Sequence, residues 1–343
     1  MSINKNFLSR ILLGCMILSF FTSVSAGNMK NTEVVKNRKE APAGSLPMEM
    51  ADPTIFHYKG TYYLYGTGGD SNNGILVYTS TDLKNWKGPK GIKNGYALTK
   101  GDSFGTKGFW APQVFLHKGK IYMAYTANEQ IAIAESDSPL GPFHQTILKK
   151  ISGADNQIDP YVFFDTTGKP YLYHVRLQYG NKIYVAELKE DLTDIIPETS
   201  KICIQGEQPW ENTANSSYPV TEGPTVLKHN NLYYLFYSAN DFRNIDYAVG
   251  YAVSNSPLGP WTKYKDNPMI SRKLIPENGT GHGDFFTDNK GNWKYVFHFH
   301  ASGNVVSPRR TGIINAAFVP GTSGVDRLEC DKKTFVELNV KSK

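Results

Sequence analysis

The sequence predicts an all-β protein, folded as a single five-bladed β-propeller, and three observations carry this prediction. A short phrase returns five times, each copy leads through a turn into an aromatic strand, and successive copies start 59, 48, 64 and 60 residues apart. Such a spacing holds a four-stranded sheet with its loops but no independent domain, and radial repetition of such sheets is a propeller. The copies are Ala51-Asp52-Pro53, Trp110-Ala111-Pro112, Ile158-Asp159-Pro160, Glu222-Gly223-Pro224 and His282-Gly283-Asp284.

Each repeat is built from the same elements in the same order. Its first strand opens on the repeated phrase, where a proline is tolerated because the amide there needs no ladder partner. A turn such as Tyr58-Lys59-Gly60 then leads into an aromatic second strand such as 62–65, which predicts a hairpin. A third element closes on an aromatic residue in at least three repeats, and we expect these residues to pack between outer strands. They are Trp86, Phe143 and Trp261.

The chain divides into a targeting segment, a leader and the propeller. Residues 1–26 have the pattern of a signal peptide: Lys5 and Arg10 precede an apolar stretch over 11–21, and Val24-Ser25-Ala26 offers a small-residue cleavage site. Residues 27–45 are a polar leader, and 46–343 are predicted to form the propeller. No apolar run is long enough to span a bilayer. We therefore expect an exported protein, periplasmic or extracellular, with no membrane span.

Composition narrows the partners. The formal net charge of +6 falls to +4 when Lys5 and Arg10 leave with the signal peptide, and no basic run suggests nucleic acid. Cys203 and Cys330 remain after cleavage and could pair in an oxidising compartment. No Cys/His pattern indicates zinc. We expect a monomer.

Residues of the repeated phrase should meet, because the first strand of every propeller blade lines the central channel. Three of them are carboxylates, Asp52, Asp159 and Glu222. Buried like charges are costly, and function explains that cost better than structure does. Considered alone, each carboxylate would be interpreted as a turn residue or a residue at the start of a strand. The shared register of the repeats places them together, and paired carboxylates are what glycoside hydrolysis requires.

In this order and spacing, the five phrases resemble glycoside hydrolase family 43, over essentially everything from Met48 to the mid-300s. The resemblance implies hydrolysis of α-L-arabinofuranosides or β-D-xylosides with inversion, by an exo-acting enzyme on plant polysaccharide side chains. It implies that Asp52 is the general base and Glu222 the general acid. Asp159 would be a third carboxylate that orients the acid and tunes its pKa.

Three further residues are assigned at the sequence level. Trp110 is expected to form an apolar wall for the terminal sugar. Of Arg309 and Arg310, we prefer Arg310 as the arginine that the family often brings to the substrate. His282 matches the family's axial histidine, which implies a hydrated cation in the channel, usually Ca²⁺. One imidazole cannot define a calcium site, so water must supply most ligands.

Several alternatives stay open. Endo-arabinanase and exo-galactanase belong to the same family. Related propellers that cleave fructosides carry an Arg-Asp-Pro triplet and a Glu-Cys pair, whereas Ile158 precedes Asp159 here and Glu329-Cys330 follows the fifth blade. A non-catalytic carbohydrate-binding propeller is a different class, and it would not need three channel carboxylates.

Overall fold

The computed structural model describes residues 43–321 and 324–342. The predicted signal peptide (1–26) and nearly all of the predicted leader (27–45) lie outside the described residues. The leader's last residue, Ser45, begins strand β1 (Ser45–Pro47), which pairs antiparallel with β21 (Asn339–Lys341). Among the described residues, no helix is long and apolar enough to cross a membrane.

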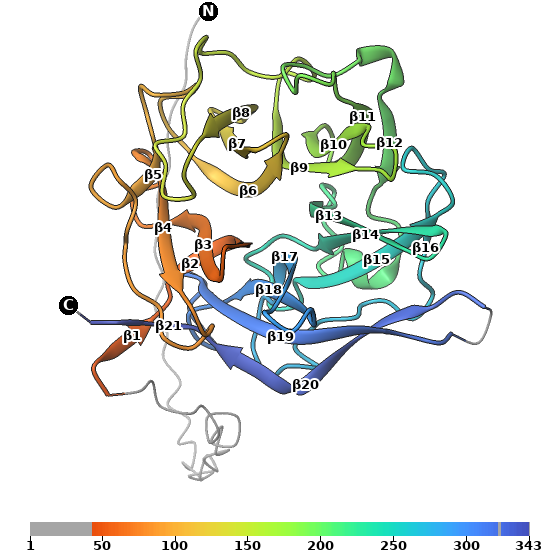
Figure 1. Cartoon of the computed structure of the whole chain (residues 1–343). Helices are drawn as coiled ribbons and strands as arrows, with labels where there is room; N and C mark the ends of the chain where they lie inside the picture. The colour runs from red at the N-terminus through yellow and green to blue at the C-terminus, as the bar shows by residue number, and fades with distance from the viewer. Residues whose placement is uncertain (1–42, 322–323, 343) are drawn as a thin grey trace, which may run out of the picture. The chain divides into compact units, whose positions relative to one another are not determined.

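Five antiparallel sheets stand around a common centre (Figure 1), so the predicted all-β, five-bladed propeller is confirmed. Four sheets have four strands and the second has three. Their strands are β2 (Met50–Tyr58), β3 (Thr61–Gly68), β4 (Gly74–Ser80) and β5 (Tyr96–Thr99); β6 (Trp110–His117), β7 (Lys120–Ala127) and β8 (Gln130–Ser136); β9 (Gln157–Phe164), β10 (Pro170–Leu177), β11 (Asn181–Glu187) and β12 (Lys201–Ile204); β13 (Thr221–His229), β14 (Leu232–Ala239), β15 (Ala248–Ser254) and β16 (Thr262–Lys263); and β17 (Gly281–Thr287), β18 (Trp293–Phe299), β19 (Arg310–Val319) and β20 (Arg327–Glu337). Two short 3-10 helices are present: η1 (Pro197–Thr199) lies between β11 and β12 of blade three, and η2 (Pro209–Glu211) lies between blades three and four.

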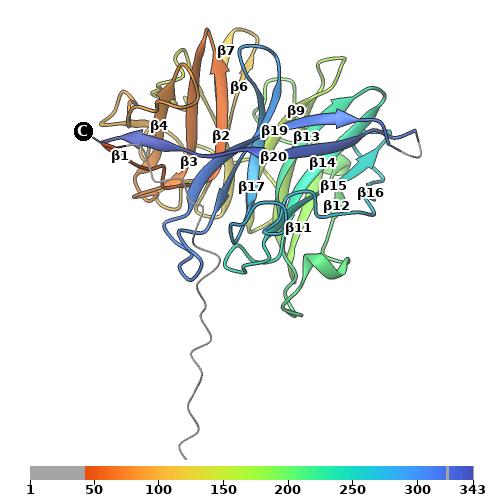
Figure 2. The same cartoon turned by 90° about the horizontal axis from the view of Figure 1, so that it is seen from below.

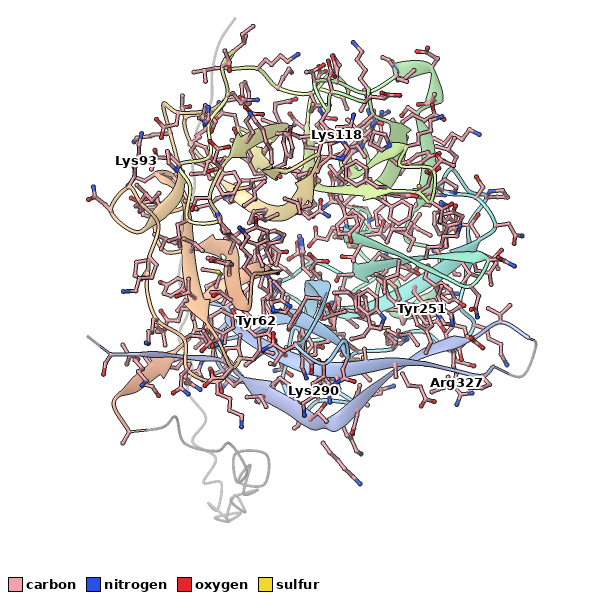
Figure 3. All side chains as sticks on the ribbon, viewed as in Figure 1. Tyr62, Lys93, Lys118, Tyr251, Lys290 and Arg327 are labelled. Carbon is pink, nitrogen blue, oxygen red and sulfur yellow. The ribbon has the colours of Figure 1, made fainter. Side chains whose placement is uncertain are left out.

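The core is divided among the five interfaces between neighbouring blades. Side chains alternate between the two faces of a strand, so adjacent residues of each second strand enter different interfaces. Leu64 packs against blade five, for example, whereas Tyr65 packs against blade two. Both faces of these strands are therefore apolar. Figure 3 contrasts Tyr62 and Tyr251, which are buried between blades, with Lys93 and Arg327 at the periphery.

The aromatic residues of the third elements lie where the sequence predicts. Trp86 and Phe143 are 0% exposed, and Trp261 is partly buried against the cluster between blades three and four. The indole Nε1 of Trp86 also donates to the carbonyl of Leu83 at 3.3 Å. These residues fill the outer part of the interfaces between blades, and polar groups occupy the centre of the propeller.

The ends of the described chain close the ring. β20 runs across the outer side of blade five toward β21 and β1 (Figure 2). Thr311 of blade five donates its hydroxyl to the carbonyl of Met50 at 2.8 Å and its amide to the carbonyl of Met48 at 3.0 Å. Blades one and five are thereby fixed in register, which matters because their residues meet at the centre.

Cys203 and Cys330 are both free thiols, so the disulfide considered from the sequence is not formed. They belong to different interfaces, between blades three and four and between blades four and five. Burial raises the pKa of the Cys330 thiol to about 12, which keeps it protonated.

Candidate active site

A β-bulge interrupts the first strand of every blade at the repeated phrase, where the register against the second strand shifts. At each bulge one residue has a φ between 40° and 60°, in the left-handed region. A bulge re-aims a side chain, and strained backbone of this kind concentrates at functional sites. The bulges therefore turn the side chains at these positions toward the common centre. The residues are Asp52, Ala111, Asp159, Gly223 and His282.

The register explains which side chains can fill the centre. Glu222 and Trp110 stand one position before the bulge residue of their own blades. In these two blades the bulge residue itself is small, Gly223 or Ala111. At Gly223 a Cβ atom would come within 2.8 Å of the His282 ring. Glycine is therefore needed at 223 both for its φ of 60° and for this close approach.

Asp52 is held by donors, one of them permanently charged. Its Oδ1 accepts from Arg309 Nη1 at 3.0 Å and its Oδ2 from the hydroxyl of Thr67 at 2.7 Å, while its own amide donates to His298 Nδ1 at 3.1 Å. Burial by itself would raise the pKa of Asp52, but the Arg309 guanidinium and then the two neighbouring histidines hold it well below its usual value. Asp52 is consequently an anion near neutral pH.

Glu222 is held by neutral donors instead. Its Oε1 accepts from the hydroxyl of Tyr247 at 2.8 Å and its Oε2 from the amide of Asn181 at 2.9 Å. Burial raises the pKa of Glu222 to about 7, and the charge of Asp52 adds to the rise, although the Tyr247 hydrogen bond opposes it. Glu222 can therefore carry a proton at a pH at which Asp52 does not.

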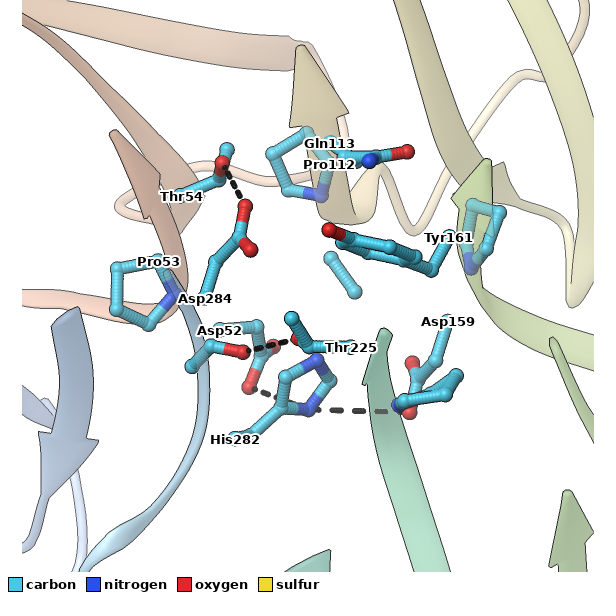
Figure 4. A pocket seen from close by; sticks show the side chains of 14 residues that line it. Asp52, Pro53, Thr54, Pro112, Gln113, Asp159, Tyr161, Thr225, His282 and Asp284 are labelled. Carbon is cyan, nitrogen blue, oxygen red and sulfur yellow. Dashed lines mark hydrogen bonds and ion pairs between the residues drawn. The ribbon is translucent and has the colours of Figure 1, made fainter. Parts of the chain in front are cut away.

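Asp159 and His282 join these two corners. His282 Nδ1 lies 3.4 Å from Asp52 Oδ1 and 3.7 Å from Asp159 Oδ2 (Figure 4), and Asp159 Oδ2 accepts from the amide of Gly223 at 3.1 Å. Burial and the neighbouring carboxylates of Glu222 and Asp52 raise the pKa of Asp159. Burial lowers the pKa of His282, which favours the neutral form of its ring.

The carboxylates face an open cavity with an empty volume of about 2070 Å³. Trp110 and Ile158 contribute apolar surface to it, and Asn212, Ser216 and Tyr218 contribute polar groups. Arg309 also lines the cavity, with its guanidinium 4.4 Å from the centre of the Phe242 ring. A mostly apolar hollow with a few fixed polar groups is typical of a small-molecule or sugar site.

Five of the six residues proposed from the sequence meet here, and one does not. Asp52, Asp159, Glu222, Trp110 and His282 all line the cavity. The choice of Arg310 as the arginine that faces the site is corrected to Arg309. Arg310 is the first residue of β19, and its guanidinium pairs with Glu337 at 3.0 Å, whereas Arg309 reaches Asp52. Neighbouring residues at a strand entry point in opposite directions, so only one of the two can face the centre.

Sequence reasoning missed four residues that hold the carboxylates: His298, Thr67, Asn181 and Tyr247. None belongs to a first strand, so the repeated phrase gives no signal for them. His298 is 0% exposed, stacks on Tyr247 with ring centres 5.6 Å apart, and has its pKa lowered to about 3 by burial. An unexplained histidine in the aromatic strand 293–299 was the one available hint.

A second, smaller hollow follows the channel beyond the carboxylates, with an empty volume of about 280 Å³. Its walls are polar: Asp284, whose pKa burial raises to about 6, accepts from Thr54 at 2.7 Å opposite Tyr161 and Gln113 (Figure 4). No group of three or more His, Cys, Asp or Glu side chains in the described part of the chain could bind a metal directly. A cation beside His282 would therefore have to take most of its ligands from water.

An ionised carboxylate, a protonatable carboxyl group and a third carboxylate at the centre of a five-bladed propeller define a glycoside hydrolase. Known proteins support this class. Glycosyl hydrolases family 43 matches residues 45–318, and the chain belongs to this family of O-glycosyl hydrolases.

Solved and curated relatives agree. The crystal structure of an endo-1,4-beta-xylanase from Bacteroides thetaiotaomicron is 41% identical, covers 86% of this chain and 98% of its own, and superposes with a TM-score of 0.78. A xylosidase/arabinosidase of Bacteroides ovatus is 28% identical, over 73% of this chain and 85% of its own. The extracellular endo-alpha-(1->5)-L-arabinanase 1 of Bacillus subtilis is 25% identical, over 71% and 74%.

Proposed function

We propose that the protein is an inverting, exo-acting glycoside hydrolase that removes α-L-arabinofuranosyl or β-D-xylosyl groups from plant polysaccharide side chains. One observation carries the mechanism: the pKa values of two buried carboxyl groups of one cavity are shifted in opposite directions. Asp52 is kept ionised by Arg309, and Glu222 is kept protonatable by burial and neutral partners.

In the proposed reaction Asp52 takes a proton from a water molecule, and the water oxygen attacks the anomeric carbon of the terminal sugar. Glu222 gives its proton to the glycosidic oxygen, so the leaving sugar departs as a neutral alcohol. Asp159 accepts a hydrogen bond from the amide of Gly223, the residue that follows the acid, and the neighbouring Glu222 carboxylate raises the pKa of Asp159. Trp110 would cover the apolar face of the terminal sugar.

The choice of sugar rests on the relatives. The Bacteroides ovatus protein is named a xylosidase/arabinosidase, which favours the two sugars proposed. The 41% identical structure is described as an endo-1,4-beta-xylanase, and this favours attack inside a xylan chain as the second candidate. Endo-arabinanase stays a third, because a 25% identical relative has that name.

A panel of substrates separates these candidates. Aryl α-L-arabinofuranoside, aryl β-D-xyloside, linear arabinan and xylan would be incubated with the protein, and the products separated by length. The proposal expects monosaccharide from the aryl glycosides and from chain ends or branches, and proton NMR during hydrolysis should show the inverted anomer first. Release of long fragments, or the retained anomer, would contradict it.

We further propose a hydrated Ca²⁺ beside His282. The ion would add positive charge near Asp52 and Asp159 and so favour their ionised forms. His282, with Asp284 farther along the same hollow, would hold it through water. Dialysis against a chelator should lower the melting temperature, and calcium should restore it. A melting temperature that is indifferent to both treatments would refute the proposal.

Export of the protein and a monomeric state are also proposed. The 1–26 pattern supports export, and the Bacillus subtilis relative is named an extracellular enzyme. Cell fractionation and N-terminal sequencing of the mature protein test this, and a new N-terminus after Ala26 is expected. Light scattering of the purified protein tests the monomer.

A further inference from the structure

Two exposed tyrosines lie on neighbouring segments of the chain, and one of them lines the cavity. All 21 tyrosines of the chain lie in the described part, and only Tyr179 and Tyr218 among them are exposed, by 92% and 41%. Tyr218 lines the cavity, and Tyr179 occupies the turn between β10 and β11. The two segments are joined because the amide of Asn181 donates to the carbonyl of Pro219 at 3.0 Å, and Asn181 forms a β-bridge with Val220.

Stability does not explain an aromatic ring at position 179. A side chain that is 92% exposed removes almost no apolar surface from water, so it adds little to folding. Its backbone has a φ of 52°, a conformation that favours glycine or asparagine and costs other residues free energy. A single exposed apolar side chain is ordinary, but two exposed aromatic rings on joined segments, one of which lines the cavity, indicate a contact surface.

The position of the pair relative to the acid indicates what it contacts. Asn181, two residues after Tyr179, donates to Glu222 Oε2 at 2.9 Å, so the turn with Tyr179 and the acid belong to one corner. A general acid must face the glycosidic oxygen of the leaving group. The tyrosines therefore belong to the Glu222 side of the cavity, toward which the leaving part of the substrate would extend.

We propose that Tyr179 and Tyr218 form an aromatic platform for sugar rings of the leaving chain, which makes a neutral oligo- or polysaccharide the preferred substrate over short glycosides. This inference rests on the proposed function. Tyrosine offers a flat apolar face with a polar tip and loses little conformational entropy on binding. The adjoining segment 212–219 has no charged side chain, and its Asn and Ser groups suit neutral sugar hydroxyls.

Single and double replacements with alanine test the platform. In the Tyr179→Ala/Tyr218→Ala variant we expect KM for a polysaccharide or long oligosaccharide to rise about tenfold, because one or two stacking contacts are worth roughly that factor. The kcat/KM for an aryl glycoside, whose leaving group is one ring, should change less than about twofold. The paired Tyr→Phe variants keep the rings and should keep most of the affinity. Ile147→Ala, 73% exposed, is the matched surface control.

Two results would overturn the platform: unchanged KM on the long substrate, or equal losses on long and aryl substrates. Failure of the proposed function is seen separately, because the wild-type protein would then cleave no glycoside. In that case titration calorimetry with xylohexaose and linear arabinohexaose against the Glu222→Gln protein still measures the platform. Binding that is weakened about tenfold by the two alanines supports it, and equal binding refutes it.

Discussion

The Asp52 corner and the Glu222 corner of the site are equally buried, yet their carboxyl groups behave in opposite ways. Asp52 is 8% exposed and Glu222 is 9% exposed, and both come from first strands interrupted by the same bulge. Asp52 faces a guanidinium, whereas Glu222 faces a phenol and an amide. Burial raises both pKa values, so the hydrogen-bond partner of each carboxyl group decides the net direction of the shift. The full positive charge of a guanidinium outweighs desolvation, and neutral donors do not.

The largest effect is expected from Asp52→Asn, which removes the base while keeping the size of the side chain. Activity on every substrate should fall by about 10³ to 10⁴, since no other group in its place can accept the proton of the water. Initial rates on aryl glycosides with good and poor leaving groups measure this. If the losses depended on the leaving group, Asp52 would not be the base.

Glu222→Gln should cost nearly as much, but only where protonation is needed. Hydrolysis of substrates with poor leaving groups should fall by about 10³, and aryl glycosides with good leaving groups should be spared, because their leaving oxygen departs without a proton. The ratio of the two rates is the measurement. Equal losses for all leaving groups would remove Glu222 from the role of acid.

Arg309→Met tests the charged partner. Without the guanidinium the pKa of Asp52 should rise by about 1 to 3 units, so the acidic limb of the pH-rate profile moves to higher pH. Arg309 also lowers the pKa of Glu222, so the basic limb should move the same way. Arg309→Lys keeps the positive charge, so both limbs of the pH-rate profile should shift less than in Arg309→Met. Arg310→Met, which loses only its pair with Glu337, is the control with an unshifted profile.

Tyr247→Phe tests the neutral partner and should have the smallest effect. The phenol stabilises ionised Glu222, so its loss should raise the pKa of Glu222. Glu222 then stays protonated to higher pH, and the basic limb moves upward by about one unit, the value of one hydrogen bond to a charged group. The acidic limb should stay in place. A basic limb that moved downward would show that Tyr247 does not donate to the ionised acid.

The sequence by itself determined the propeller and the residues at its centre. The repeated phrase fixes the register of the first strands, and strands that share a register around one axis must bring equivalent positions together. Asp52, Asp159, Glu222, Trp110 and His282 could therefore be placed without a structure. Trp86 and Phe143 could be assigned to the interfaces for the same reason.

Tertiary structure alone decided everything that depends on the connections between successive strands of a blade. Arg309 and Arg310 are adjacent in the sequence, and only the point at which β19 begins selects the one that reaches Asp52. Asn181 is the first residue of β11, directly after a turn, and Tyr247 lies in the loop before β15, and the course of these connections follows no repeat. The strand periodicity carries no information about such segments, and their contacts with Asp52 and Glu222 set the protonation states. The repeats thus determined which carboxyl groups meet, and the loops determined what each of them can do.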